Sequence, residues 1–146
     1  MFSKTTEYAL RATIYIAQKS TIKNKLGIVE ISEAIDSPQS FTAKILQMLT
    51  KDNKVISSAK GPNGGFYITG QSKKLPARAI LEAVNDDEVL QRCVLGLRHC
   101  SEKTPCPMHE DFRQIRTRLT KLFEKQTIGN LAQKMNKHNF FINNTK

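Results

Sequence analysis

The sequence of 146 residues contains no long hydrophobic run. A helix that crosses a bilayer needs about 20 consecutive apolar residues, so we expect no transmembrane segment and no membrane partner. The first seven residues also lack the apolar core of a secretory signal peptide. These two absences predict a cytoplasmic protein.

Cysteine is scarce as well, with three residues in the whole chain, all between positions 93 and 106. An odd number of cysteines without an export signal argues against a disulfide framework. The roles left for these side chains are metal ligation, catalysis and plain burial.

Acidic residues are outnumbered: the chain carries 23 Lys and Arg against 13 Asp and Glu, a net charge of +10. Residues 1–80 hold 12 of the basic side chains and 5 of the acidic ones, so most of the surplus lies there. Such a surplus favours a polyanionic partner, either nucleic acid or an anionic membrane surface. Every basic amphipathic stretch has an expected role in the core, so none is left to bind a membrane surface. Nucleic acid is therefore the favoured partner.

The spacing of apolar residues predicts three helices in the first third of the chain. They cover residues 4–19, with Ser3 as the N-cap, residues 28–35, and residues 38 to about 52. In the third of these helices the polar residues are expected on the outer face, opposite the apolar stripe.

Two β-prone runs follow, at 55–58 and 66–69, and the Gly- and Pro-rich stretch between them predicts a hairpin. Three helices followed by a hairpin are the order of a winged helix-turn-helix. In that fold the third helix enters the major groove, and the hairpin, or wing, contacts DNA backbone or minor groove.

The second half of the chain predicts a helix from about 76 to 84, an irregular stretch at 86–109 and a long helix at 110–125. Apolar residues of the long helix step by 3, 4 and 3, which is typical of a coiled-coil seam; they are Phe112, Ile115, Leu119 and Leu122. A short helix at 128–135 and an Asn-rich tail, expected to fray, complete the chain.

We therefore predict a mainly α protein: a winged helix-turn-helix with a small β-hairpin wing plus a long C-terminal dimerisation helix. The expected parts are a DNA-binding domain at 1–85, a cysteine-rich cluster-binding loop at 86–109, and the dimerisation helix with the C-terminal segment at 110–146.

Polar side chains in two places are candidates for contacts with DNA, because such groups read base edges or hold phosphates. The candidates are Gln39, Ser40, Thr42 and Lys44 on the third helix and Lys60, Gly61, Asn63 and Gly64 in the wing. A plain solvated face would show the same residue types, and winged helices also serve as protein-interaction modules.

The cysteines form a second candidate site. Cys93, Cys100, Cys106 and His109 lie within 17 residues, and thiolates clustered in this way suit an iron–sulfur cluster or zinc. The spacing alone favours neither metal group, and a redox-active free thiol without a metal is a third alternative. A thiol enzyme would need a fixed base and an oxyanion site; no such partner is evident, so we expect no enzyme.

Three segments together resemble a known family. They are Thr6 to Arg11 at the start of the first helix, the wing from Val55 to Phe66, and the three-cysteine loop before a long helix. In this order they resemble the Rrf2 family of bacterial winged-helix transcription regulators, some of which sense iron–sulfur clusters or nitric oxide. The resemblance covers about residues 1–135.

The resemblance implies a homodimer that binds a double-stranded DNA operator as a repressor, switched by a cluster on the three cysteines. A [2Fe–2S] cluster is favoured over [4Fe–4S], and a zinc-stabilised module without sensing is the alternative. In members that sense cluster supply the fourth ligand is a histidine three residues after the last cysteine, which matches His109. In nitric-oxide-sensing members it is an acidic residue of the partner subunit, which matches Glu7.

Two departures from the family pattern affect what can be carried over. Six residues separate Cys93 from Cys100, whereas the commonest family pattern has five. Lys60 stands where arginine is frequent, and Lys44 replaces an acidic or neutral residue. Because lysine lacks the planar fork of arginine, the operator sequence of relatives is not expected to apply.

Overall fold

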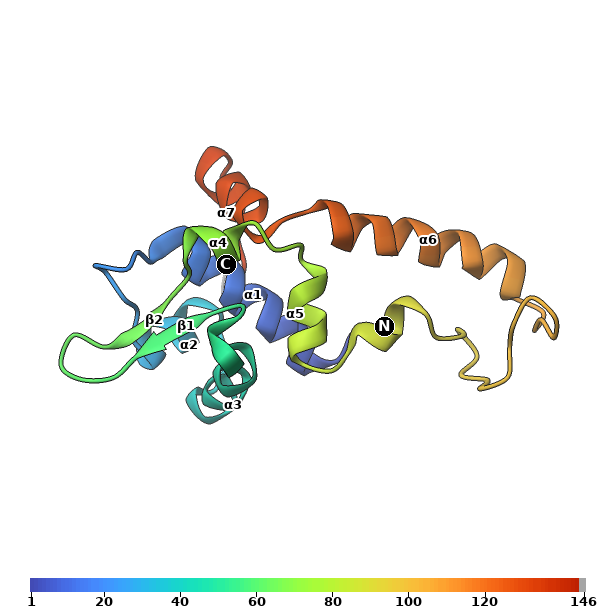
Figure 1. Cartoon of the computed structure of the whole chain (residues 1–146), viewed down its shortest axis with the longest axis horizontal. Coiled ribbons are helices and arrows are strands. Elements are labelled where there is room, and N and C mark those ends of the chain that lie inside the picture. The colour runs from blue at the N-terminus through green and yellow to red at the C-terminus, as the bar shows by residue number, and fades with distance from the viewer. Residues whose placement is uncertain (145–146) are drawn as a thin grey trace.

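A computed structural model describes residues 1–144 of the chain; residues 145 and 146, the last of the expected segment 110–146, lie outside the described part. Helices dominate, and one antiparallel pair of strands forms the sheet (Figure 1). In chain order the elements are α1 (Lys4–Lys19), α2 (Ile28–Ala34), α3 (Gln39–Leu49), η1 (Lys51–Asn53), β1 (Ser57–Ala59), β2 (Gly65–Tyr67), α4 (Gly70–Lys73), α5 (Arg78–Ala83), η2 (Asp87–Leu90), α6 (His109–Lys125) and α7 (Ile128–Lys137).

The first helix has the bounds expected from the sequence, because its start signal is local. The hydroxyl of Ser3 accepts a hydrogen bond from the backbone N–H of Thr6 at 3.2 Å and caps the helix. Ala9, Ala12 and Ile16 are fully buried along one side. α1 therefore forms the centre around which α2, α3 and α7 pack (Figure 1).

The recognition helix candidate α3 is shorter than expected and ends at Leu49. The next residues form the 3₁₀ turn η1, in which Asp52 and Asn53 have positive φ angles of 57° and 50°. Asp and Asn tolerate this left-handed conformation better than other side chains do. The backbone therefore leaves the helix three residues earlier than the apolar pattern indicated.

The wing is paired with the register Ser57 to Tyr67 and Ala59 to Gly65, one or two residues away from the expected strand bounds. Leu26 extends the base of the wing through two backbone hydrogen bonds with Phe66, of 2.9 and 2.8 Å. A Cβ on Gly65 would lie 2.7 Å from the carbonyl oxygen of Leu26, so only glycine allows this close approach. The wing is thereby fixed to the α1–α2 connection.

The buried apolar residues form two cores. The first joins α1, α2 and α3 and includes Ile128 and Ala132 of α7. The second joins α5 and η2 to α6 and consists of Ala77, Leu81, Val89, Leu90 and Phe123. Because α7 belongs to the first core, the expected boundary at 109/110 does not separate the whole C-terminal segment from the winged-helix part.

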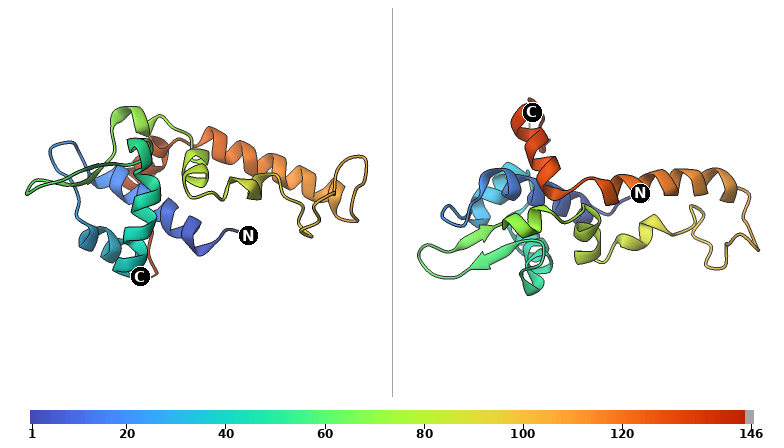
Figure 2. Two further views of the ribbon diagram at one scale, coloured as in Figure 1. Left: turned by 60° about the horizontal axis from the view of Figure 1, so that its bottom comes forward. Right: turned by 45° about the horizontal axis from the view of Figure 1, so that its top comes forward.

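Helix α6 projects from the second core as an arm. The cysteine loop runs beside this arm and joins α6 at its far end (Figures 1 and 2). The root of α6 is fixed by two backbone hydrogen bonds: Ala77 N–H donates to Gln126 at 2.7 Å, and Ile128 N–H donates to Leu75 at 3.0 Å. The molecule thus consists of a winged-helix body with one helical arm.

The C-terminal tail was expected to fray, and this expectation is wrong for the described residues. Ile142 packs against the first core, and the side-chain amide of Asn143 donates a hydrogen bond to the carbonyl oxygen of Ala34 at 3.2 Å. The described part of the tail therefore lies beside the last residue of α2 at Asn143. Among residues 1–144, no helix is both long and apolar enough to cross a membrane.

Candidate functional site

The cysteine loop runs through residues 91–108 without a helix or strand. Its start is tied to the arm, because the guanidinium of Arg116 on α6 donates hydrogen bonds to the carbonyl oxygens of Gln91 and Arg92. Its end leads directly into α6 at His109. Both ends of the loop are therefore fixed on one helix, which brings the three cysteines together.

The three thiols form a compact group. Cys93, Cys100 and Cys106 have all their Sγ atoms within 4.8 Å of one another, and each residue is half-buried. The sulfurs of Cys93 and Cys106 are 3.6 Å apart. Within residues 1–144 this is the only such group of His, Cys, Asp and Glu side chains, so the spacing seen in the sequence becomes a single site in space.

His109 contacts this group from the first position of α6. Its Nδ1 lies 3.3 Å from the Sγ of Cys100, whereas its Nε2 is buried without a hydrogen-bond partner. A buried polar atom without a partner costs free energy and requires an explanation. Three thiols beside an imidazole are the donor set that zinc and iron–sulfur clusters take, so these residues fit such a group.

The thiols influence one another's protonation. Hydrogen bonds from the backbone of Leu97, then of Leu95, and contacts with the other two thiols lower the pKa of Cys93 to about 7. For Cys100 a backbone hydrogen bond from Cys106 acts in the lowering direction. Burial and the neighbouring sulfurs of Cys106 and Cys93 outweigh that bond and raise the pKa of Cys100. The site thus favours the thiolate form of Cys93 and the protonated form of Cys100.

The sequence did not indicate Arg116, although a signal was present. Arg116 lies seven residues after His109, which is two turns along the same face of a helix. Its guanidinium lines the thiol site together with Val94, Met108 and Phe112 and lies 5.9 Å from the centre of the Phe112 ring. Arg116 thus lies beside the thiols and holds the start of the loop.

Glu7, the other candidate fourth ligand, is not brought to the thiols within one chain. It lies in the first turn of α1, where its carboxylate is 3.3 Å from the Nζ of Lys4. The expectation concerned a carboxylate reaching across a dimer, so it stays a prediction.

The DNA-contact candidates on α3 divide into two sets. Gln39 and Ser40 at the start of the helix and Lys44 at its middle are exposed, as expected. Thr42 is fully buried, and its hydroxyl donates to the carbonyl oxygen of Pro38 at 2.9 Å. The expectation that Thr42 lies on the outer face is wrong, because it belongs to the buried stripe.

The wing candidates lie at the free end of the hairpin. Lys60, Gly61 and Asn63 are exposed. Gly64 is half-buried, and a Cβ there would lie 2.3 Å from the carbonyl oxygen of Ala59. Gly64 is therefore required by the tight turn at the tip, and the exposed residues beside it are free to meet a partner.

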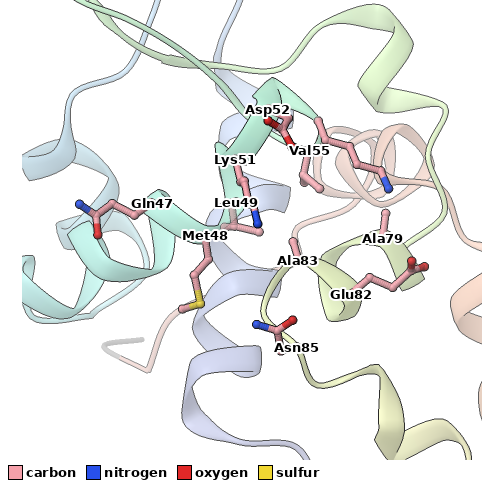
Figure 3. Close-up of a pocket in the computed structure, with 11 residues that line it drawn as sticks. Gln47, Met48, Leu49, Lys51, Asp52, Val55, Ala79, Glu82, Ala83 and Asn85 are labelled. Atoms are coloured by element: carbon pink, nitrogen blue, oxygen red, sulfur yellow. The ribbon is translucent and has the colours of Figure 1, made fainter.

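A hollow of about 630 Å³ separates the end of α3 from α5 (Figure 3). Its floor is apolar, with Leu49, Val55 and Ala79 buried, and its rim carries charges of both signs, including Lys51 and Glu82. The hollow lies apart from the thiols. It lies beside the end of α3, on the side that faces α5.

Comparison with protein families gives one match that spans most of the chain. The profile of the family described as "Rrf2: Iron-dependent Transcriptional regulator" matches residues 2–134. This range includes the winged-helix body, the cysteine loop and α6.

Similar proteins support the same assignment. An HTH-type transcriptional regulator of Aquifex aeolicus is 32% identical over 142 residues, which cover 96% of each chain. The HTH-type transcriptional regulator IscR of Escherichia coli is 27% identical over 125 residues, which cover 86% of this chain and 75% of IscR. These relatives are transcriptional regulators, not enzymes.

A solved structure is similar in fold. The structure of CymR, the global cysteine regulator of Bacillus subtilis, superposes with a TM-score of 0.73, 16% sequence identity, and coverage of 91% of this chain and 96% of CymR. The mainly α winged helix-turn-helix predicted from the sequence is thereby confirmed.

The opposite pKa shifts of two thiols predict selective alkylation of the metal-free protein. Thiolates react and thiols do not, so the rate at Cys93 should reach half its plateau near pH 7 and fall about tenfold for each pH unit below that. Cys100, whose pKa is raised, should react far more slowly at pH 7. Peptide mass spectrometry after brief treatment with iodoacetamide measures both rates, and equal rates would contradict the assignment.

Proposed function

The chain belongs to the Rrf2 family of iron-dependent transcriptional regulators, and from this premise we propose that it is a cytoplasmic, homodimeric repressor whose affinity for operator DNA is switched by an iron–sulfur cluster. The observation that carries the proposal is the group of three thiols with His109 beside it, held at the far end of α6. A bound cluster would supply a group that responds to oxidation, nitric oxide or iron supply.

Two close pairs of donors support a [2Fe–2S] cluster in particular. Cys93 and Cys106 are 3.6 Å apart, and Cys100 and His109 are 3.3 Å apart. Each iron of a [2Fe–2S] cluster takes two protein ligands, whereas the four irons of a [4Fe–4S] cluster take one each. Ligands that lie in two pairs fit the first arrangement better.

Zinc is the alternative, and one distance supports it. Tetrahedral Zn²⁺ with Zn–S bonds of about 2.3 Å places its ligand sulfurs roughly 3.8 Å apart, close to the 3.6 Å between Cys93 and Cys106. A zinc site would stabilise the loop but would not sense electrons. The iron dependence of the family favours the cluster.

Anaerobic purification should give a coloured protein with about two irons and two sulfides per chain, the composition of a [2Fe–2S] cluster. Cys106→Ala should abolish the colour, and His109→Ala should lower the iron content. Ser101→Ala, in the same loop, is the matched control and should keep the wild-type spectrum. Glu7→Gln should also keep it if His109 is the fourth ligand. A colourless protein with one zinc per chain would contradict cluster binding.

The DNA-binding part of the proposal depends on the exposed start of α3 and the free end of the wing. Lys44 and Lys60 are both exposed, and the elements that carry them, α3 and the wing, belong to the winged-helix body and lie away from α6 (Figure 1). Gln39, Ser40 and Asn63 offer hydrogen-bonding groups beside them. We propose that these side chains and the wing backbone at Gly61 and Gly64 contact operator DNA.

Replacing both Lys44 and Lys60 with Ala should weaken binding to a duplex that the wild-type protein selects from a random pool. Each lost phosphate contact should reduce the slope of log K against log salt by about 1. Lys134→Ala is the matched control, because α7 lies on the opposite side of the body from α3 (Figures 1 and 2). Fluorescence anisotropy at several salt concentrations measures the slopes, and unchanged binding by the double variant would place DNA on another face.

The homodimer is proposed from the apolar seam of α6. Ile115 and Leu122 are 53% and 52% exposed, and Phe112 and Leu119 of the same seam are only half-buried. An apolar row on a projecting helix loses free energy in water and gains it against a second copy. Two arms paired along this seam would place two recognition helices on one DNA.

Ile115→Glu should dissociate the dimer, because it places a charge in the seam without a partner. Sedimentation equilibrium should then give the chain mass of 16.5 kDa, where the wild type gives twice that value. Lys121→Glu introduces the same group on the opposite side of α6 and should leave the dimer intact. A wild-type protein of single-chain mass, or a dimeric Ile115→Glu variant, would refute this use of the seam.

Two links connect the loop to the body and support the switching mechanism. Leu90, three residues before Cys93, is buried in the second core with Phe123. Asp86 at the start of η2 accepts hydrogen bonds from the hydroxyls of Thr6, at 2.6 Å, and Ser3, at 3.4 Å. A change in the loop would therefore act on the start of α1, against which α3 packs.

A further inference from the structure

The sulfurs of Cys93 and Cys106, 3.6 Å apart, support a second chemistry in the absence of metal. We propose that, in the metal-free protein, Cys93 and Cys106 are a modification site: a hydroperoxide oxidises this pair to a disulfide, and Cys100 stays a free thiol. The proposal concerns the protein without a cluster, so it does not depend on which metal group the loop binds.

The distance between the two sulfurs favours this reaction. They are 3.6 Å apart, and a disulfide bond requires about 2.05 Å. The approach of roughly 1.5 Å must come from the backbone or the side-chain rotamers. Residues 91–108 contain no helix or strand, so the loop can adjust without breaking a regular element.

The choice of partner follows from the position of Cys100. Its sulfur lies within 4.8 Å of the other two but is engaged by the Nδ1 of His109 at 3.3 Å, whereas the sulfurs of Cys93 and Cys106 face each other at 3.6 Å. Both residues of the pair are half-buried. A small peroxide can therefore reach them.

The reaction balances with the peroxide as the only oxidant. One thiol gives its proton to water, and its sulfur attacks a peroxide oxygen. The O–O bond breaks and a sulfenic acid forms. The hydroxide that leaves takes a proton and becomes the first water. The second sulfur attacks the sulfenic sulfur, the S–S bond forms, the S–O bond breaks, and the hydroxyl leaves as the second water after taking a proton. Two thiols and one hydrogen peroxide thus give one disulfide and two waters, because two electrons pass from sulfur to oxygen.

The sequence allows an unambiguous test, because Arg92, Arg98, Lys103 and Arg113 place the three cysteines on three different tryptic peptides. Metal-free, fully reduced protein is treated with one equivalent of hydrogen peroxide, alkylated and digested. We expect peptide 93–98 joined to peptide 104–113, and peptide 99–103 carrying the alkyl group. The intact chain should be lighter by two hydrogens before alkylation, and dithiothreitol should restore all three thiols.

Variants separate this pair from the other two. Cys93→Ser and Cys106→Ser should each abolish the intrachain disulfide, and Cys100→Ser is the matched control that should keep it. A disulfide that contains Cys100, a disulfide only between chains, or sulfinic acid without a disulfide would overturn the proposal. Iron and sulfide analysis of untreated protein tests the cluster separately, so failure of one proposal is distinguishable from failure of the other.

Discussion

The packing of Phe123 into the second core is the interaction on which the rest of the arrangement depends. Phe123 is the only residue of α6 (His109–Lys125) that is buried, and its ring lies 5.5 Å from that of Phe2. From this anchor α6 (His109–Lys125) extends about 21 Å back to His109 at 1.5 Å per residue. The arm thus carries the thiols away from the body but keeps them mechanically connected to it.

The anchor also explains why α6 has two different faces. One face buries Phe123 at the root and presents Arg116 and His109 to the loop. The seam containing Ile115 and Leu122 stays exposed in a single chain. A helix whose thiol-binding face adjoins the face that meets a partner copy, with Phe112 at the edge of both, would connect the loop geometry to the spacing of two recognition helices, which is what a dimeric DNA-binding protein must control.

The features that short-range interactions determine were predicted correctly from the sequence. The cap at Ser3, the order of three helices and a hairpin, and the long helix were all predicted from short-range patterns, and the structure contains them. The error at Thr42 was avoidable: it precedes Ile45, Leu46 and Leu49 by three, four and seven residues, which places it in their stripe. The prediction for Thr42 relied on its polar side chain and not on its place in the helical repeat.

Other features were beyond sequence reasoning because they depend on contacts between distant segments. Nothing local indicates that Arg116 meets the carbonyl of Gln91, or that Ile142 returns to the first core. The sequence showed that three cysteines and His109 lie close along the chain. It could not show which donors pair, because the pairs follow from how the loop folds back on α6.

The charge state of the thiols is what makes this loop suited to a switch. Its internal contacts are few and local, such as the turn in which the hydroxyls of Ser101 and Thr104 lie 3.1 Å apart, so regular structure does not determine its shape. Without a cation, the pKa of Cys100 is raised by burial and by its neighbours, and a second thiolate is disfavoured. A metal group reverses this balance, since it binds thiolates and compensates their charge. If the loop binds a metal group as proposed, its occupied and empty forms would differ in protonation and geometry, and the packing of Phe123 would carry that difference to the body.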